Sequence, residues 1–81
     1  MPSVVTRILG EGYDRPVLDF GCGTGDLTRL LTQTFPTVHG YDPSSESTDL
    51  AKRRTPAATF FDDPESLPKE HYGCVVLANV L

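Results

Sequence analysis

The residues with chemical potential are concentrated in one short stretch, VLDFGCGTG at positions 17–25. An apolar run there carries Asp19, and Gly21, Gly23 and Gly25 then alternate with other residues. Glycine reaches backbone angles that are closed to other residues, and it lets the main chain approach a ligand without an intervening Cβ. Such a triplet also occurs in ordinary tight turns. The spacing therefore indicates a nucleotide-like ligand without identifying it.

Two kinds of nucleotide cofactor compete for this loop. The dinucleotide fingerprint is G-x-G-x-x-G, and Gly21 and Gly23 fit it, but Asp26 occupies the third glycine position. A carboxylate at the start of a helix would repel the pyrophosphate that docks there, and Asp19 adds a second negative charge. These charges favour S-adenosylmethionine, which carries a sulfonium and an ammonium and no phosphate. Asp26 also has an ordinary explanation, because a carboxylate in the first turn suits the helix dipole.

A third acid, Asp42, follows Asp19 by 23 positions and stands where a second strand is expected to end. A carboxylate at that place can accept hydrogen bonds from both ribose hydroxyls of an adenosine. This geometry serves NAD and S-adenosylmethionine alike, so Asp42 supports a nucleoside without choosing between the two cofactors. The other interpretation is a turn aspartate ahead of Pro43 and Ser44.

The elements that must position these acids follow from alternating apolar runs and breaks. Helices are expected at 3–9, at 47–54, and around Leu27, Leu30, Leu31 and Phe35 up to the stop at Pro36. Strands are expected at 17–20, 37–42, 58–61 and from 74 to 77 or beyond. This order predicts an α/β fold, a Rossmann-like doubly wound parallel sheet of about four strands with helices on its faces. Right-handed crossovers place the first strand centrally.

Composition excludes several classes of protein. The chain has 81 residues, a net charge of −4 and a pI near 4.8, which bounds it to at most one domain and argues against a nucleic-acid scaffold. The basic triplet at 52–54 is expected to decorate a helix end. Cys22 and Cys74 form neither a metal-ligand spacing nor a disulfide framework, and nothing beside them activates a thiol. No secretory leader or membrane-spanning run is visible, so a cytoplasmic protein is expected.

The chain ends at Val80 and Leu81, inside or just after the last apolar strand. An unpaired apolar strand at a sheet edge invites association with another chain. We therefore expect residues 1–81 to be the N-terminal, cofactor-binding part of a single larger domain. The last strand is the expected place of any association.

Beyond these features, the chain resembles the class I S-adenosylmethionine-dependent methyltransferases over roughly residues 13–81. VLDFGCGTG is similar to the family's first motif, and GYDPS at 40–44 resembles the second, whose acid holds the ribose. FFDDPESLP at 60–68 resembles the third, in which an acid meets the adenine amino group, with Asp62 in place of a common glycine. YGCVVLANVL at 72–81 resembles the motif near the methionine end, although Gly73 replaces the usual acid.

The resemblance implies a seven-stranded sheet, of which four strands fall within this chain, and S-adenosylmethionine as cofactor. The cofactor-binding residues that it implies are Asp19, Gly21, Cys22, Gly23, Gly25, Asp42, Asp62, Asp63 and Asn79. We assign no catalytic base and no metal ligand. His39 is expected to pack or to face solvent, and His71 to be solvated beside Glu70.

The function expected from these observations is methyl transfer from S-adenosylmethionine. A small-molecule acceptor is favoured, because no basic stripe or aromatic platform indicates a nucleic acid. One alternative is a non-catalytic, truncated chain that binds cofactor poorly or serves as an interaction module. The other is an NAD-dependent oxidoreductase, which the displaced third glycine disfavours.

Overall fold

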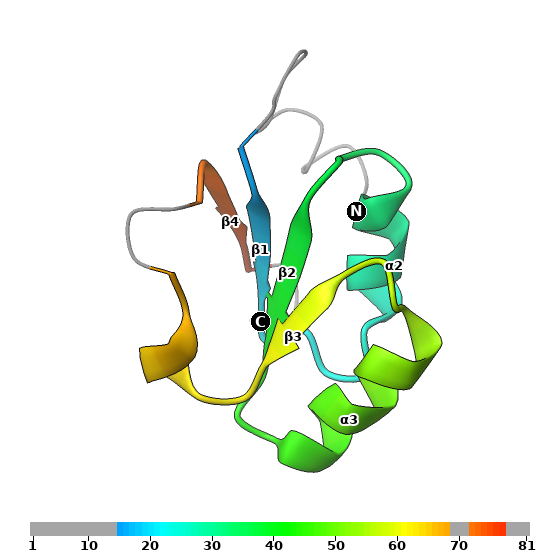
Figure 1. Cartoon of the computed structure of the whole chain (residues 1–81), viewed down its shortest axis with the longest axis vertical. Coiled ribbons are helices and arrows are strands. Elements are labelled where there is room, and N and C mark those ends of the chain that lie inside the picture. The colour runs from blue at the N-terminus through cyan, green and yellow to red at the C-terminus, as the bar shows by residue number, and fades with distance from the viewer. Residues whose placement is uncertain (1–14, 69–71, 78–81) are drawn as a thin grey trace.

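The computed structural model describes residues 15–68 and 72–77, and its elements alternate between strands and helices (Figure 1). In chain order they are β1 (Val17–Phe20), α2 (Asp26–Thr32), β2 (Val38–Tyr41), α3 (Ser45–Arg54), β3 (Thr59–Phe61), a 3-10 helix (Pro64–Ser66) and β4 (Cys74–Val76). The helix expected at 3–9, His71, Asn79 and the terminal Val80 and Leu81 lie outside the described residues. None of the helices described is both long and apolar enough to cross a membrane.

The four strands form one parallel sheet in the order β3-β2-β1-β4. β1 is an inner strand, as predicted, and the α/β fold is confirmed. The register pairs Asp19 with Gly40 and Gly40 with Phe60, so these three residues point to the same face of the sheet. Because all strands run the same way, their carboxyl ends meet at one edge, where doubly wound folds bind ligands.

Both α-helices cover one face of the sheet, as Figure 1 shows. Under α2 lies a core cluster made of Val17, Leu31, Phe35, Val38, Cys74 and Val76, with Leu27 packed against it. Under α3 lies a second, smaller cluster made of Cys22, Ala51 and Phe60, with Ala58 at its margin. The second cluster includes a residue of the glycine loop. The loop is therefore part of the packing between sheet and helix.

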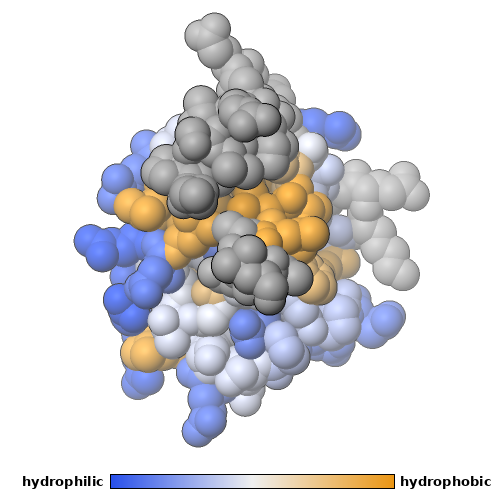
Figure 2. All heavy atoms as spheres, turned by 180° about the vertical axis from the view of Figure 1, so that it is seen from behind, coloured by the Kyte–Doolittle hydropathy of each residue, from blue (hydrophilic) through white to orange (hydrophobic). Residues whose placement is uncertain are grey.

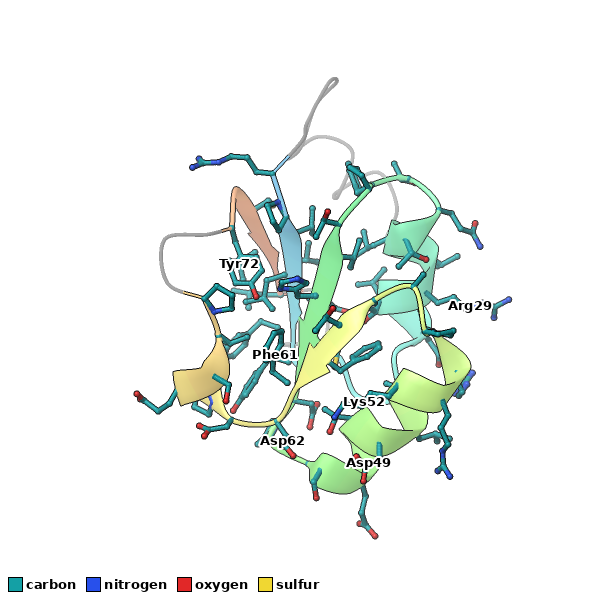
Figure 3. The ribbon with its side chains drawn as sticks, in the orientation of Figure 1. Arg29, Asp49, Lys52, Phe61, Asp62 and Tyr72 are labelled. Carbon is teal, nitrogen blue, oxygen red and sulfur yellow. The ribbon has the colours of Figure 1, made fainter. Side chains whose placement is uncertain are left out.

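The opposite face of the sheet is aromatic. The rings of Phe20 and Tyr41 lie 4.9 Å apart, and His39 lies 5.3 Å from both Phe61 and Tyr72. Figure 3 shows Phe61 and Tyr72 on the side of the sheet away from α2 and α3.

Figure 2, a view from behind, shows hydrophobic side chains gathered near the middle and mostly neutral or hydrophilic ones below them. Among the residues that the structure describes, the exposed large apolar side chains are Phe20, Leu30, Leu50, Val75 and Leu77.

The first helix differs from the expected one. α2 ends at Thr32, whereas the apolar spacing extended it to Phe35. Phe35 precedes Pro36, and the residue before a proline avoids helical angles. After Thr32 the hydrogen bonding is mixed: Thr34 N–H donates to Leu31 O at 3.0 Å, a 3-10-type bond, and Phe35 N–H donates to the same oxygen at 2.9 Å, an α-type bond. Leu30 is 56% exposed, so the apolar side of this helix is narrower than its sequence indicated.

The second helix begins at Ser45, two residues before the expected start. Its N-cap is Ser44, whose Oγ accepts a hydrogen bond from Ser47 N–H at 3.2 Å. The basic triplet occupies the last turn of α3, as predicted, where cations suit the helix dipole. A 3-10 helix at Pro64–Ser66 follows β3, in a stretch for which the sequence pattern predicts neither a helix nor a strand.

Candidate cofactor site

The glycine loop is tied to the end of β2 by backbone hydrogen bonds. Gly21 N–H and Cys22 N–H both donate to Tyr41 O, at 2.8 and 2.9 Å, and Gly25 N–H closes the turn onto Cys22 O at 3.0 Å. Gly21, Gly23 and Gly25 have φ values of 85°, 56° and 92°. These are left-handed conformations that side chains with a Cβ resist. The loop geometry therefore depends on glycine at all three positions.

The three glycines differ in what surrounds them. A Cβ built on Gly25 would lie 3.1 Å from Ala51 Cβ and 3.4 Å from Phe60 Cζ, so Gly25 allows α3 to pack closely. A Cβ on Gly21 or Gly23 would meet nothing within 4 Å. The space beside Gly21 and Gly23, called the cradle below, is open, so a ligand there could approach the main chain closely. Gly25 has a packing role, which the spacing of the triplet did not distinguish.

Asp42 lies directly beside this cradle. Its Oδ2 accepts a hydrogen bond from Gly23 N–H at 2.9 Å, and its Oδ1 accepts one from Ser44 N–H at 3.0 Å. The interpretation of Asp42 as a turn aspartate is therefore confirmed, and the residue also borders the glycine loop, while its contact with a ribose stays a prediction. Its side chain is half-buried at the carboxyl end of β2. A carboxylate oxygen has two lone pairs, so each oxygen can still accept a ligand hydroxyl.

Asp19 is the most unusual polar group of the site, because it is fully buried within β1. Its Oδ2 accepts a hydrogen bond from the Thr28 hydroxyl at 2.7 Å. Its Oδ1 has no hydrogen-bond partner among the residues described. Burial raises the pKa of Asp19 above its ordinary value, and the Thr28 hydrogen bond offsets part of that rise. Thr28, in the first turn of α2, is a partner that the sequence did not identify.

The raised pKa of Asp19 gives a pH-dependent prediction for stability. Between the ordinary pKa and the raised one, the folded chain keeps a proton that the unfolded chain has lost, so the free energy of unfolding falls as pH rises through this window. Asp19→Asn removes the titration and can keep the Thr28 contact. We expect the variant to be more stable than the parent at neutral pH, with the gain vanishing below the ordinary pKa. Urea unfolding at several pH values measures this, and parallel curves would contradict it.

Cys22 anchors the glycine loop to the core between the sheet and α3. Its side chain is buried against Ala51 and Phe60, and its backbone N–H donates to Tyr41 O. Burial, together with the negative charges of Asp19 and Asp42, raises the pKa of the Cys22 thiol to about 12. The thiol is therefore protonated at physiological pH and is a poor nucleophile. Contact between Cys22 and a cofactor stays a prediction.

Both thiols are expected to be inert in the folded protein. Cys74 is also buried and free, and burial raises its pKa as well. At pH 8, Cys22 should react with an aromatic disulfide reagent on the order of 10³-fold more slowly than in urea, because thiolate is the reactive form. Release of the chromophore, followed with and without denaturant, measures both thiols. Rapid modification of the native chain would show that the loop opens.

The third motif lies next to Asp42, because Asp42 N–H donates to Phe61 O at 3.1 Å. Asp62 and Asp63 follow β3 and are exposed, and Figure 3 shows Asp62 beyond the end of that strand. Asp63 caps the 3-10 helix through a hydrogen bond from Glu65 N–H to its Oδ1 at 2.9 Å. Both acids thus lie at the carboxyl ends of the strands, the edge of the sheet that also carries the glycine loop. A contact with adenine stays a prediction for each of them.

Asp26 has a partner that the sequence did not predict. Asp26 accepts a hydrogen bond from Arg54 at 3.0 Å, an exposed ion pair between α2 and α3. Because Arg54 offsets the negative charge of Asp26, this residue is weaker evidence against a pyrophosphate than its position in the sequence indicated.

His39 lies on the aromatic face, with Nδ1 2.6 Å from the Tyr72 hydroxyl, and burial raises the pKa of Tyr72 to about 12. The expected packing role of His39 is confirmed.

This arrangement defines a Rossmann-like nucleoside-binding fold, with a left-handed glycine turn after the central strand and an acid after its neighbour. The sequence profile of a methyltransferase domain family matches residues 1–81. The chain belongs to this methyltransferase domain family. An uncharacterised methyltransferase of Anoxybacillus flavithermus is 38% identical over 77 residues, which are 91% of this chain and 36% of the relative.

Solved structures agree with this assignment. A putative S-adenosylmethionine-dependent methyltransferase of Listeria monocytogenes superposes with a TM-score of 0.68 at 26% identity, over 90% of this chain and 36% of the other. S-adenosylmethionine-bound CalS10, an amino pentose methyltransferase of Micromonospora echinaspora, gives a TM-score of 0.65 at 30% identity, over 73% of this chain and 25% of the other. In each of these comparisons the chain spans less than two fifths of the relative's length.

Proposed function

We propose that this chain binds S-adenosylmethionine and supplies the cofactor-binding part of an enzyme that transfers its methyl group to a small molecule. The observation that carries the proposal is the cradle over Gly21 and Gly23, bordered by the carboxylate of Asp42. An adenosine ribose beside Asp42 would donate its hydroxyls to that carboxylate. The open glycines would let the amino-acid part of the cofactor lie against the main chain.

The charge of the site supports this cofactor over a dinucleotide. The unpartnered Oδ1 of buried Asp19 lies in the strand directly before the glycine loop. A buried acceptor of this kind is stabilised by a donor or a positive charge, and S-adenosylmethionine brings both an ammonium and a sulfonium. NAD would instead bring two phosphates toward Asp19 and Asp42. The residues present thus fit S-adenosylmethionine.

In the proposed reaction the cofactor supplies an activated methyl group, and the residues of this chain bind and orient it. Asp42 would fix the ribose, while Gly21 and Gly23 would fix the backbone contact. Holding the donor in line with its acceptor is the main catalytic contribution such a site can make, because alignment removes translational and rotational freedom from the reaction. No catalytic base is assigned to the described residues.

A small molecule is proposed as acceptor on the basis of charge. The chain carries a net charge of −4, and its basic triplet, at the end of α3, is partly used by the Arg54–Asp26 ion pair. A polyanionic acceptor would need a positive surface near the site. The solved relative CalS10 acts on an amino pentose, which is a small molecule.

The test is methyl transfer from S-adenosylmethionine labelled in its methyl group. The protein is incubated with a low-mass metabolite fraction, with RNA, and with denatured protein as three separate acceptor pools. We expect label in the low-mass pool, with equimolar S-adenosylhomocysteine formed. Label in the RNA or protein pool would contradict the acceptor class. Binding of S-adenosylhomocysteine without transfer to any pool would favour a non-catalytic cofactor-binding chain.

A further inference from the structure

Asp42 makes a contact that ribose binding does not require. Its two carboxylate oxygens bind two backbone N–H groups from separate segments, Gly23 in the loop after β1 and Ser44 at the N-cap of α3. The contact to Gly23 spans 19 positions of sequence. One side chain of the chain itself therefore connects the glycine loop to the start of α3.

The glycine that donates this hydrogen bond is not restrained by side-chain packing. A Cβ on Gly23 would meet no atom within 4 Å, whereas Gly25 packs against Ala51 and Phe60. Gly21 and Cys22 are held by their hydrogen bonds to Tyr41 O, and Gly25 by its bond to Cys22 O. The hydrogen bond from Gly23 N–H to Asp42 thus restrains the apex of the loop. A glycine otherwise loses more conformational entropy on ordering than any other residue.

We propose that Asp42 is a positioning residue for the glycine loop, in addition to its proposed role toward the ribose. The effect on cofactor affinity rests on the proposed function, whereas the hydrogen bond itself joins two residues of this chain. The carboxylate orders the loop apex in advance, so the cofactor meets a preformed cradle and does not have to order Gly23 on binding. Preorganisation of this kind raises affinity by lowering the entropic cost of association.

The first test requires no mutation and no ligand. A scalar coupling across the hydrogen bond, between the Gly23 amide nitrogen and the Asp42 carboxyl carbon, is measured by NMR in the unmodified protein. A detectable coupling supports the hydrogen bond between these residues. Its absence, with the neighbouring backbone couplings of β1 and β2 present, would overturn the proposal whatever the protein binds.

The second test compares Asp42→Asn and Asp42→Ala with Asp49→Asn, a matched change of an exposed acid on α3 (Figure 3). Amide hydrogen exchange is followed in the ligand-free protein. Loss of a hydrogen bond to a charged group should speed exchange at Gly23 by roughly tenfold to a hundredfold in the Asp42 variants. Exchange at Leu18 and His39 should stay unchanged. Equal acceleration at all three amides would show general destabilisation and would overturn a specific role toward the loop.

The consequence for binding is tested with S-adenosylhomocysteine and its 2′,3′-dideoxy analogue, which lacks both ribose hydroxyls. If Asp42 orders the loop, Asp42→Ala weakens both ligands, and the dideoxy analogue should lose about threefold to tenfold in affinity. If Asp42 serves only the ribose, the analogue binds the variant and the parent equally, which would overturn the positioning role. Failure of both ligands to bind the parent would contradict the proposed function. The hydrogen-exchange result would still decide whether Asp42 orders the glycine loop.

Discussion

Gly40→Ala is expected to destabilise the fold strongly. A Cβ at this position would lie 2.7 and 2.8 Å from Phe60 Cδ1 and Cε1, and 3.1 Å from Cys22 Cβ. Gly40 is in the inner strand β2, where hydrogen bonds to β1 and β3 hold the backbone on both sides. The ring of Phe60 is buried and must move. Overpacking of this kind costs about 1–3 kcal/mol, a large fraction of the stability of so small a core.

The measurement for Gly40→Ala is urea unfolding followed by circular dichroism. The matched control is the double variant Gly40→Ala with Phe60→Leu, which replaces the rigid ring with a side chain that can turn away from the new methyl group. The two changes should be strongly non-additive, with the double variant more stable than the sum of the single effects requires. Strict additivity, or an unchanged midpoint for Gly40→Ala, would contradict the packing of Phe60 over Gly40.

Gly23→Val is expected to weaken cofactor binding strongly while leaving most of the fold intact. The side chain would project into the open cradle, where no protein atom lies within 4 Å, so it would occupy the space proposed for the cofactor. The φ of 56° imposes some strain on any side chain, of order 1–3 kcal/mol for a branched one. Affinity for S-adenosylhomocysteine should fall at least about tenfold, or 1.4 kcal/mol.

The control for this prediction is a pair of alanine variants. Gly23→Ala carries the strain with little bulk and should weaken binding less than Gly23→Val. Gly25→Ala places its methyl group against Ala51 and Phe60, so it should lower stability more than Gly23→Ala does. Calorimetric titration and urea unfolding measure the two effects separately. Equal affinity of the parent and Gly23→Val would remove the loop from the proposed site.

The sheet could be predicted because local signals and topology agree. Short apolar strands such as Val17–Phe20 are bounded by proline and glycine, and parallel crossovers then place β1 inside the sheet. Helix boundaries were less accurate because they depend on single contacts. Ser44 caps α3 earlier than the apolar pattern indicated, and Pro36 ends α2 through the conformation of the residue before it. Neither contact changes the hydrophobic period, so periodicity could not locate the boundary.

The candidate site was predictable in its parts but not in its connections. The motif positions placed Asp19, Asp42 and the glycine loop at the carboxyl ends of adjacent strands, where the structure has them. The contacts from Thr28 to Asp19 and from Gly23 to Asp42 join residues 9 and 19 positions apart, and no periodic pattern marks such pairs. The division of the glycines between cradle and packing likewise depends on neighbours such as Phe60, which only the folded chain brings together.

The central claim is that the cradle over Gly21 and Gly23, with Asp42 beside it, holds S-adenosylmethionine. The most direct measurement is a titration of S-adenosylhomocysteine into the isotopically labelled protein, followed by amide chemical shifts, with NADH as the comparison ligand. We predict saturable shifts centred on Gly21, Gly23 and Asp42 with S-adenosylhomocysteine and none with NADH. Shifts centred instead on the aromatic face around His39 and Phe61, or a response to NADH at the glycine loop, would contradict the account.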